Sequence, residues 1–416
     1  MGKQVEALVV GGGAVGVCTA FFLAQQGMQV TLLEKDALAS GSSHGNAGLV
    51  AYNHAIPLAG PGVLGQGLRW LADPESPFYI KPRPSVELAR WLLQFQACCN
   101  ERAVRAIIPP LLEIGRASHA LYTELIDEYK LDCNYEHKGR LYLYRTAAML
   151  RKGEHKAQLL AEHGVPSELL DAGAARRMEP NLQPDVIGGI YYPLYAHITP
   201  GKFVHALAAV AGGLGVNIHT QTEVLALESS AGRIARVVTT RGDFLPQHVV
   251  MATGAWSPEW SRQLKLRLPI QPAKGYSFTV RRPAACPNMS LSLEEAQIAV
   301  TPMGSEMRFS STLELGGMDL SINQRRTDAM RRALSRYMRG MENLEVLELW
   351  RGLRPLTPDS LPIIGRSPQH TNVVLATGHG MLGITHAPMT GRLAAQLVAG
   401  SQPAMNLRPF QVERFQ

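Results

Sequence analysis

The sequence predicts an α/β protein in which a Rossmann-like dinucleotide-binding domain with a parallel sheet carries an inserted α+β domain built on a mixed sheet. Two glycine motifs lead to this prediction, GGGAVG at residues 11–16 and GHGMLG at residues 378–383. They lie near opposite ends of a chain of 416 residues, and a single hydrophobic core rarely grows beyond about 250–300 residues. We therefore expect two domains.

The composition is that of a globular protein, with 46% hydrophobic and 18% charged residues. The formal net charge of +7 permits an anionic partner, but the basic residues are not interleaved with aromatic ones, so no nucleic-acid partner is expected. The five cysteines show no C-x-x-C pair and no zinc-type spacing, so we expect a reducing cytoplasm and no metal site. Glu6 interrupts the first apolar stretch, which argues against a signal peptide, and no apolar run reaches the roughly 18 residues of a membrane span.

The N-terminal residues have the pattern of a βαβ unit. Residues 5–10 form an apolar, β-branched run typical of a buried parallel strand. The helical spacing of residues 14–26 ends at a glycine, and a second strand is predicted at residues 29–33. Glu34 follows about 20 positions beyond the first glycine, where a carboxylate accepts hydrogen bonds from ribose hydroxyls. Together these signals predict a dinucleotide-binding site.

Each glycine of the first motif has a separate task. Gly11 permits the tight turn, Gly13 lets the backbone approach a pyrophosphate, and Gly16 lets helix and strand pack closely. Ala14 and Val15 begin the helix, whose first N–H groups attract phosphate. The acid after the second strand argues against a 2′-phosphate and leaves NAD and FAD open.

The residues that follow Glu34 distinguish between NAD and FAD as the expected cofactor. KDALASGSSHGNAGLVA, residues 35–51, is rich in glycine, serine and alanine and lacks apolar periodicity, which is typical of an extended loop. Within it, SGSSHGNAG resembles the segment that runs along the FAD pyrophosphate in the D-amino-acid oxidase superfamily of flavoproteins. The resemblance implies cofactor contacts from Lys35, Ser42, Ser43, Asn46, Ala47 and Gly48.

Two later segments are similar to the same superfamily. HVVMATGAWSP, residues 248–258, is a predicted strand that ends at Thr253 and Gly254, and it resembles the superfamily's second flavin-domain signature near the adenosine end. NIHTQTEVLALE, residues 217–228, predicts paired strand segments in which Val224 offers its backbone to adenine.

The most extensive resemblance covers residues 352–400, which contain the second glycine motif after a strand predicted at residues 372–376. A helix is predicted from about Ala387, but neither a further strand nor an acid follows at the right distance, so no nicotinamide site is expected. The resemblance implies instead that the helix start faces the flavin ring, where charge accumulates on reduction. The implied cofactor residues are Gly378, His379, Gly380, Met381, Leu382, Gly383, Ile384 and Thr385.

The resemblance implies an FAD-binding domain of the D-amino-acid oxidase type made of residues 1–57, 200–264 and 348–416, with residues 58–199 and 265–347 forming the substrate domain. In the substrate domain we expect helices at 85–100, 111–129 and 147–163, followed by strands at 139–144, 188–195, 275–280 and 307–317 and a basic helix.

Arg354, in the GLRP motif, is the predicted partner of a substrate carboxylate, because a guanidinium offers a planar fork and keeps its charge when partly desolvated. The alternative is a structural salt bridge to Asp359 or a contact with a helix C-terminus. Tyr52 and His54 follow the flavin loop directly and are candidates to reach over the ring. His197, in a tyrosine-rich strand, is a candidate for the same cavity.

We expect FAD to be bound non-covalently. The histidine linkage of some relatives maps to Gly45, with His44 one place early, and no cysteine follows Cys286.

The sequence is similar to the bacterial D-amino-acid dehydrogenases through SGSSHGNAGLV, GLRPLTPDSLPIIG and TGHGMLGIT. That resemblance implies oxidation of a free amino acid, with D-proline and hydroxy-D-proline among the candidates, by hydride transfer to flavin N5. The imino acid then hydrolyses to a 2-oxo acid, and the electrons pass to a quinone or respiratory carrier. A glycine or sarcosine oxidase using O₂, an L-amino-acid deaminase, a 2-hydroxy-acid dehydrogenase and an electron-relay subunit of a larger complex stay open, as does the oligomeric state.

A respiratory acceptor implies peripheral contact with the inner face of the cytoplasmic membrane. The segment NQRRTDAMRRALSRYMRG, residues 323–340, is consistent with such contact, because basic and apolar residues occupy different helical faces. The alternative is a solvated face of a substrate-domain helix. The two faces consist of Arg325, Arg332, Arg336 and Arg339, and of Met330, Leu334, Tyr337 and Met341.

Overall fold

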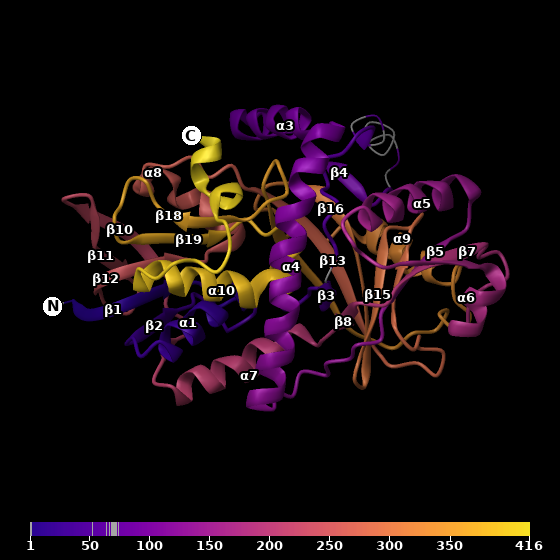
Figure 1. The fold of residues 1–416 in the computed structure, drawn as a ribbon, viewed down its shortest axis with the longest axis horizontal. Coiled ribbons are helices and arrows are strands. Elements are labelled where there is room, and N and C mark those ends of the chain that lie inside the picture. The colour runs from indigo at the N-terminus through magenta and orange to yellow at the C-terminus, as the bar shows by residue number, and fades with distance from the viewer. Residues whose placement is uncertain (1, 52, 64, 66, 68–72, 74) are drawn as a thin grey trace.

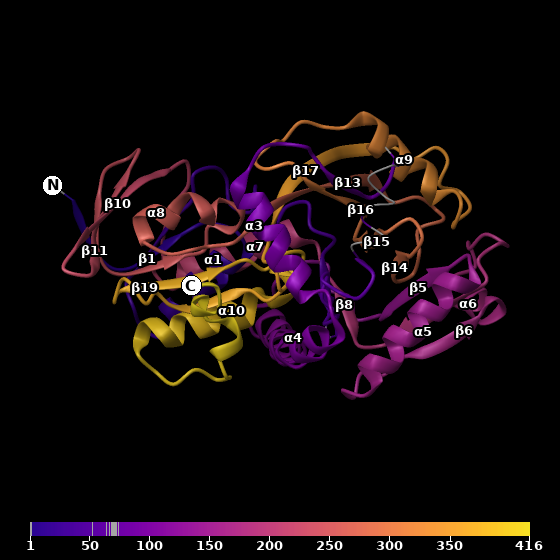
Figure 2. The same cartoon turned by 90° about the horizontal axis from the view of Figure 1, so that it is seen from above.

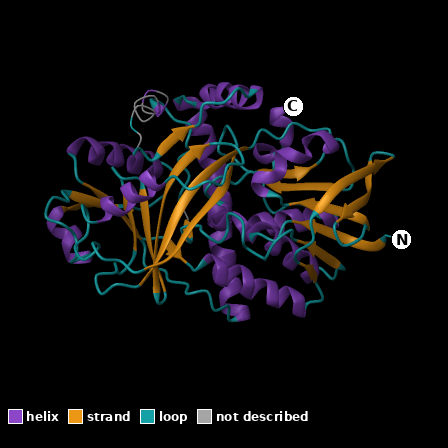
Figure 3. Cartoon of the chain, turned by 180° about the vertical axis from the view of Figure 1, so that it is seen from behind, coloured by secondary structure: helices purple, strands orange, loops and turns teal. Residues whose placement is uncertain are grey.

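Two large β-sheets stand on either side of a long central helix, α4 (Glu101–Tyr129) (Figures 1 and 3). The structure is a computed structural model that describes residues 2–51, 53–63, 65, 67, 73 and 75–416. None of the helices in this described part of the chain has both the length and the apolar character needed to cross a lipid bilayer.

The first sheet joins the two ends of the chain. Its central strands run in the order β10-β11-β12-β1-β2-β9, and β19 pairs with β12 in parallel. Figure 1 shows the indigo N-terminal strand near the yellow C-terminal segments. The strands are β1 (Lys3–Val10), β2 (Val30–Leu33), β9 (Asn217–His219), β10 (Val224–Ser230), β11 (Arg233–Thr239), β12 (Phe244–Met251), β18 (Ile363–Arg366) and β19 (Val373–Thr377).

The second sheet runs in the order β17-β13-β16-β15-β14-β5-β7-β6, with β4 paired to β16. A small antiparallel pair, β3 (Leu49–Ala51) and β8 (Tyr195–His197), links segments of the two halves. The strands are β4 (Phe78–Ile80), β5 (Arg140–Tyr144), β6 (Glu168–Asp171), β7 (Gly188–Tyr192), β13 (Gln271–Arg281), β14 (Ser290–Leu293), β15 (Ile298–Met303), β16 (Glu306–Leu315) and β17 (Val346–Leu356).

Helices cover both sheets. α1 and α10 pack against each other and, with α4 and α7, form one hydrophobic core beside the first sheet. α5 and α9 lie on opposite sides of the second sheet (Figure 2). The helices are α1 (Ala14–Gln25), α3 (Val86–Cys98), α5 (Ala147–Ala161), α6 (Ala172–Met178), α7 (Pro200–Gly213), α8 (Ser261–Leu264), α9 (Gln324–Leu334) and α10 (Gly383–Ala399).

Several element boundaries differ from the sequence expectations. α4 begins at Glu101, ten residues before the predicted start at 111, and continues through Pro109 and Pro110. The prolines remove backbone hydrogen bonds, but a stripe of buried apolar residues on both sides of them packs into the core and offsets that loss. α10 begins at Gly383, before the predicted start at Ala387.

Strand pairing also differs from the expectation in two places. The segments at 217–228 do not pair with each other, because β9 pairs with β2 and β10 pairs with β11. The expected domain boundary between residues 347 and 348 falls inside β17, which pairs along its length with β13 of the second sheet. By strand pairing, the second sheet therefore extends to Leu356.

The basic segment at residues 323–340 is helical only from Gln324 to Leu334. Met330, Leu334, Tyr337 and Met341 are buried in the core of the second sheet, so this apolar face is not available to a lipid surface. On the outer side, Arg332 Nη2 lies 2.9 Å from Glu75 Oε2. The segment therefore packs as a helix of the substrate-domain sheet.

We expect Gly391→Ala to lower the free energy of unfolding by about 1–3 kcal/mol, the typical cost of overpacking. A Cβ at this position of α10 would lie 2.6 Å from the carbonyl carbon of Cys18 in α1. The control is Gly212→Ala in α7, where a Cβ meets nothing within 4 Å and the better helix former adds about 0.5–1 kcal/mol. Urea denaturation measures both changes, and equal stability of the two variants would contradict the close α1–α10 contact.

Candidate active site

A continuous cavity of about 1780 Å³ extends between the two sheets. Pockets for single drug-sized ligands usually measure about 300–1,000 Å³, so this cavity has room for a dinucleotide together with a small substrate. Its wall combines the glycine turns of the first sheet with side chains from one face of the second sheet.

Most of the residues predicted from the sequence line this one cavity. They are Gly11, Gly13, Ala14, Val15, Glu34, Lys35, Ser42, Ser43, Asn46, Ala47, His54, Val224, Thr253, Gly254, Arg354, His379, Gly380, Met381, Leu382, Gly383, Ile384 and Thr385.

Gly16, Gly48, Gly378 and His197 lie outside the cavity wall, and Tyr52 lies outside the described residues. A Cβ on Gly16 would lie 1.8 Å from the Gly11 carbonyl oxygen, so this glycine serves helix–strand packing, as expected. Gly48 has a φ of +71° and a Cβ there would lie 2.1 Å from the Ile198 carbonyl oxygen. Gly378 similarly shapes a turn, with a φ of +76°.

His197 is fully buried away from the cavity. Its Nε2 lies 4.0 Å from Glu136 Oε2, and burial lowers its pKa to about 4. Tyr195 and His197 share a face of β8 because side chains alternate along a strand. Only Tyr195 lines the cavity, because the cavity ends before the position of His197.

The first glycine turn leaves its helix start open to the cavity. Gly13 is the N-cap of α1 and contributes no side chain there. A Cβ added to Gly13 would have one described neighbour within 4 Å, Ser43 Oγ at 3.3 Å. The same Ser43 Oγ accepts a hydrogen bond from the Ala14 N–H at 3.0 Å. Glu34 accepts the Gly12 N–H at 2.6 Å and the Asp36 N–H at 2.9 Å, which keeps its carboxylate at the cavity edge.

The loop at residues 42–46 is held by Arg308 of β16. This arginine is only 4% exposed. Its Nη1 donates to the carbonyl oxygens of His44 and Asn46, the latter at 3.1 Å, and its Nε donates to Thr279 Oγ1 at 3.0 Å. Burial lowers the pKa of Arg308, but a guanidinium stays protonated. A lone arginine in a polar strand carries no motif, so sequence reasoning did not find it.

β17 fixes the other side of the same loop. A Cβ on Gly45 would lie 2.0 Å from the Trp350 ring, so the backbone packs directly on the indole. Ser42 Oγ donates to the Leu353 carbonyl oxygen. His44 Nε2 lies 2.9 Å from Glu348 Oε1, so this histidine is engaged with a side chain of β17.

The C-terminal glycine motif meets the loop from the opposite direction. Asn46 Nδ2 donates to the Met381 carbonyl oxygen at 3.3 Å, and Thr385 Oγ1 donates to the Leu49 carbonyl oxygen at 2.8 Å. α10 begins here without a side-chain cap, as α1 does. The N-termini of two helices, with their positive dipole ends, therefore face one cavity.

Two histidines in the cavity wall are neutral. Burial lowers the pKa of His379 to about 3, and its Nε2 lies 2.9 Å from Thr390 Oγ1. Burial, followed by repulsion from Arg140 and Lys156, lowers the pKa of His54 to about 4. Near neutral pH both rings therefore offer one donor and one acceptor without a charge.

Arg354 presents an unneutralised cation to the cavity. Its side chain crosses Gly275, where a Cβ would lie 1.8 Å from Nη1, and Nη1 donates to the Thr312 carbonyl oxygen at 2.6 Å. Asp359, the alternative partner considered from the sequence, instead pairs with Arg414 at 2.7 Å. Burial lowers the pKa of Arg354 to about 10, and no ion pair to an acid is found among the described residues.

The strand beneath Arg354 is bent by a bulge. Thr312 has a φ of +65°, and the β13–β16 register shifts between Lys274 and Tyr276. Thr312 Oγ1 accepts the Tyr276 N–H at 3.2 Å. The unusual backbone conformation turns the Thr312 carbonyl toward Arg354, and a strained residue of this kind persists only where its surroundings hold it in place.

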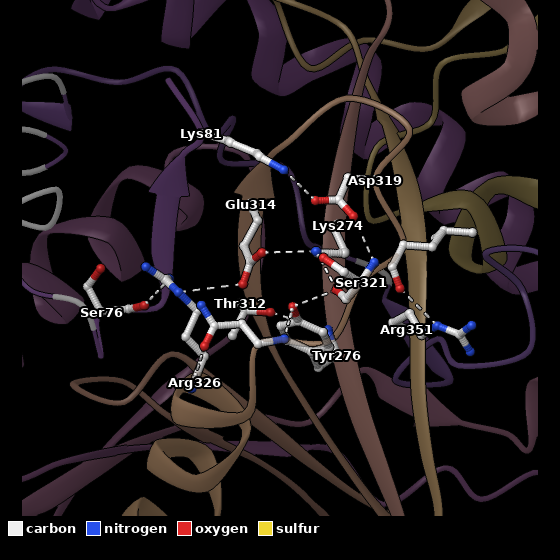
Figure 4. A network of polar contacts seen from close by, with 12 residues as sticks. Ser76, Lys81, Lys274, Tyr276, Thr312, Glu314, Asp319, Ser321, Arg326 and Arg351 are labelled. Carbon is white, nitrogen blue, oxygen red and sulfur yellow. Dashed lines mark hydrogen bonds and ion pairs between the residues drawn. The ribbon is translucent and has the colours of Figure 1, made fainter. Parts of the chain in front are cut away.

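Buried charges behind the sheet provide that support (Figure 4). Glu314 lies between two cations, at 3.3 Å from Lys274 Nζ and 3.5 Å from Arg326 Nε. Lys274 Nζ also donates to the Ser321 carbonyl oxygen at 2.6 Å. Because Lys274 pairs with Leu353 while Ala273 pairs with Arg354, this network lies on the sheet face opposite the Arg354 side chain.

Comparisons with known proteins agree with this geometry. The family described as FAD dependent oxidoreductase, DAO, matches residues 6–397. A D-amino acid dehydrogenase of Methylobacterium nodulans is 34% identical over 406 residues, which cover 96% of each chain. A D-amino acid dehydrogenase of Vibrio atlanticus is 30% identical over 420 residues, which cover 99% of this chain and 100% of that relative.

Solved structures share the fold. Glycine oxidase from Geobacillus kaustophilus superposes with a TM-score of 0.82 at 24% identity and covers 100% of both chains. L-proline dehydrogenase from P. horikoshii superposes with a TM-score of 0.77 at 21% identity, covering 100% of this chain and 98% of that chain.

The residues of the cavity fit FAD, the cofactor of this family. The open helix start at Gly13 suits a pyrophosphate, and Glu34 retains acceptor capacity for ribose hydroxyls. The uncapped start of α10 suits the electron-rich edge of a flavin. Among the described residues, no group of three or more His, Cys, Asp or Glu side chains is placed to hold a metal ion.

We expect Arg308→Met to weaken FAD binding by at least about tenfold, because it removes charge-assisted hydrogen bonds worth about 1.5–3 kcal/mol. The loop at residues 42–46 then loses its tie to β16. The ratio of flavin absorbance to protein absorbance, together with an FAD titration of the apoprotein, measures the effect. The control is Arg282→Met, which removes an exposed arginine that donates to the Gly304 carbonyl oxygen. Full flavin content in the Arg308 variant would contradict the assignment.

We expect acid precipitation to release all flavin into the supernatant. His44 is paired with Glu348, and no cysteine lies among the described lining residues of the cavity. Fluorescence of the supernatant and of the washed pellet measures the partition. Flavin that stays with the pellet shows a covalent bond and contradicts this prediction.

Proposed function

The chain belongs to the DAO family of FAD-dependent oxidoreductases, and we propose that it oxidatively deaminates a free amino acid. The proposed substrate is a D-amino acid. The substrate carbon bearing the amine loses two electrons and its hydrogen. The resulting imino acid adds water and releases ammonia and a 2-oxo acid.

The observation that carries this proposal is the Arg354 guanidinium. It lies in the cavity wall without an acidic partner among the described residues, held only by carbonyl oxygens of β16. Burial of an unpaired cation costs free energy unless an anionic ligand pairs with it. A carboxylate matches the two parallel N–H donors of a guanidinium. An amino acid supplies that carboxylate next to the carbon to be oxidised.

The protein residues position the substrate and exclude water. Arg354 binds the carboxylate and thereby sets the orientation of the neighbouring Cα. Tyr142, Tyr195 and the neutral His54 line the same cavity and limit the approach of solvent. When bound, FAD supplies the two-electron acceptor that the reaction requires. Both wall histidines are uncharged near neutral pH, so neither repels the substrate's amine, and each ring offers one acceptor nitrogen.

The D stereochemistry and the electron acceptor rest on the relatives. Proteins 30–34% identical to this chain over nearly its full length are D-amino acid dehydrogenases, whereas L-proline dehydrogenase shares the fold at 21% identity. The dehydrogenase names support a quinone or respiratory carrier as acceptor in place of O₂. Cyclic substrates such as D-proline and hydroxy-D-proline belong to the proposed range. Their product is a cyclic imine that keeps its nitrogen, so no ammonia is released.

We expect Arg354→Met to lower kcat/KM by about 100-fold or more while FAD content is unchanged, because truncating one partner of a buried charge pair costs about 2–5 kcal/mol. Arg354→Lys keeps the charge but loses the fork, so a smaller loss is expected. Steady-state reduction of an artificial dye measures both. The control is Arg351→Met, an exposed arginine of the same strand. Unchanged kinetics in Arg354→Met would remove the basis of the proposal.

Anaerobic bleaching of the flavin by matched D- and L-amino acids tests the stereochemistry. We expect bleaching with the D-enantiomers, proline and hydroxyproline included, and slow reoxidation by O₂ compared with a quinone. Faster bleaching by L-enantiomers, or by 2-hydroxy acids, would replace the proposed substrate class. A chain that reduces the dye unaided is an enzyme in its own right and not only a relay subunit.

A further inference from the structure

We propose that the cavity contains a second binding subsite, formed by Arg140, that receives a carboxylate or another strong hydrogen-bond acceptor at the end of the substrate's side chain. The inference rests on the proposed amino-acid oxidation and narrows its substrate class. It selects amino acids with extended side chains that end in an acceptor.

Arg140 is a buried cation with unused donors. The residue lies on β5, is 4% exposed and lines the cavity. Its Nε and Nη1 have no hydrogen-bond partner among the described residues. Buried charges in proteins are normally paired, because desolvation of an isolated cation is costly. We infer that a ligand group in the cavity accepts hydrogen bonds from the Nε and Nη1 donors of Arg140.

The immediate surroundings favour a cation without neutralising it. The guanidinium carbon lies 5.0 Å from the Tyr142 ring centroid and 5.7 Å from that of Tyr195. The two tyrosine hydroxyls are 3.1 Å apart and bond to each other. Aromatic faces attract a guanidinium by about 0.5–2 kcal/mol each, which holds Arg140 in place but leaves its charge intact.

Glu294 follows the neighbouring strand β14, but Arg140 pairs with Ser290, so Glu294 is four residues beyond the partner of Arg140. No ion pair joins the two side chains among the described residues. Glu294 lines the same cavity, and its Oε1 accepts the Ser292 hydroxyl at 2.7 Å. The Arg140 cation therefore has no acidic partner among the described residues and can bind an acceptor of the ligand.

The strand register places Arg140 and Arg354 on one face of the second sheet. Arg140 lies two residues before Tyr142, and Arg354 lies four residues after Trp350, so each shares the face of that neighbour. One continuous row of paired residues connects these neighbours: Tyr142, Ser292, Ala299, Ser310, Ser277 and Trp350.

The distance between the two cations excludes short side chains. Arg354 is bonded to the Thr312 carbonyl on β16, and β16 is separated from β5 by β15 and β14. At about 4.8 Å per strand step the two strands lie roughly 14 Å apart along the sheet. Only the combined length of the Arg140 side chain and an extended substrate side chain can bridge that gap.

The cavity wall on the α5 side adds further positive charge. Arg151, Lys152 and Lys156 line the cavity from α5 and are exposed at its edge. None of them forms an ion pair within the described part of the chain. Unpaired cations along an approach path raise the local concentration of anions, so this side suits entry of a substrate that carries a second negative group.

A chain-length series of substrates tests the subsite. The measurement is kcat/KM, by dye reduction, for aspartate, glutamate and 2-aminoadipate, each against an apolar amino acid of equal length and of the enantiomer that the enzyme prefers. We expect the preference for the acid to grow along the series and to reach about tenfold or more at 2-aminoadipate. The preference for the acid should appear as a lower KM with a similar kcat, because Arg140 lies away from the reacting carbon.

Arg140→Met should abolish that preference while leaving kcat for the apolar substrates within about twofold of the parent enzyme. Methionine keeps an unbranched chain between the two tyrosines, and replacement of a buried charge by an apolar group is often tolerated. Arg140→Lys should retain part of the preference, and Arg351→Met, on an exposed position of β17, should retain all of it. A thermal shift produced by glutarate in the parent enzyme but not in Arg140→Met provides a readout without turnover.

The proposal is overturned if the parent enzyme shows no preference for the acids, or if Arg140→Met lowers kcat/KM equally for acidic and apolar substrates. Either result leaves the proposed amino-acid oxidation standing. Failure of every amino acid to reduce the flavin is a separate outcome, which removes the proposed function and this inference with it.

Discussion

The candidate site depends on the loop at residues 42–46, because this loop is hydrogen-bonded to the start of α1, to the turn before α10 and to β16 of the second sheet. Ser43 accepts the first N–H of α1, Asn46 donates to the turn before α10, and Arg308 binds two of the loop's carbonyl oxygens from the second sheet. The same guanidinium also donates to Thr279 Oγ1 within the second sheet, so it joins the loop to the strands beneath it. Together with two side-chain contacts of the loop to β17, this bond holds the loop against the substrate wall.

The second organising feature is the distribution of positive charge in the substrate wall. Glu314 lies between Lys274 and Arg326 behind the sheet, whereas Arg354 and Arg140 on the cavity face form no ion pair within the described part of the chain. The ion pairs behind the sheet support the bulge at Thr312. A cation in a low-dielectric wall gains most from an anion in the same enclosure, and for this reason we propose that Arg354 and Arg140 bind substrate groups.

Some elements were predicted wrongly for clear physical reasons. The helix predicted to start at residue 111 begins at Glu101, because tertiary packing of residues on both sides carries α4 through Pro109 and Pro110. His197 was grouped with Tyr195 by its strand, yet the cavity extends only to Tyr195. The apolar face of the basic segment was a candidate for membrane contact, whereas the core of the second sheet buries it.

By itself the sequence determined the first glycine turn. Gly11 has a positive φ and Gly16 packs against the Gly11 carbonyl oxygen, and both requirements come from local backbone geometry that glycine alone meets. Only the tertiary structure decided which charges are paired. Asp359 pairs with Arg414 and not with Arg354. Arg308 donates to a loop more than 260 positions away in the sequence. Arg140 lines the cavity, although no motif around it in the sequence indicates this. Those outcomes depend on strand register between distant segments, and register is a property of the assembled sheet.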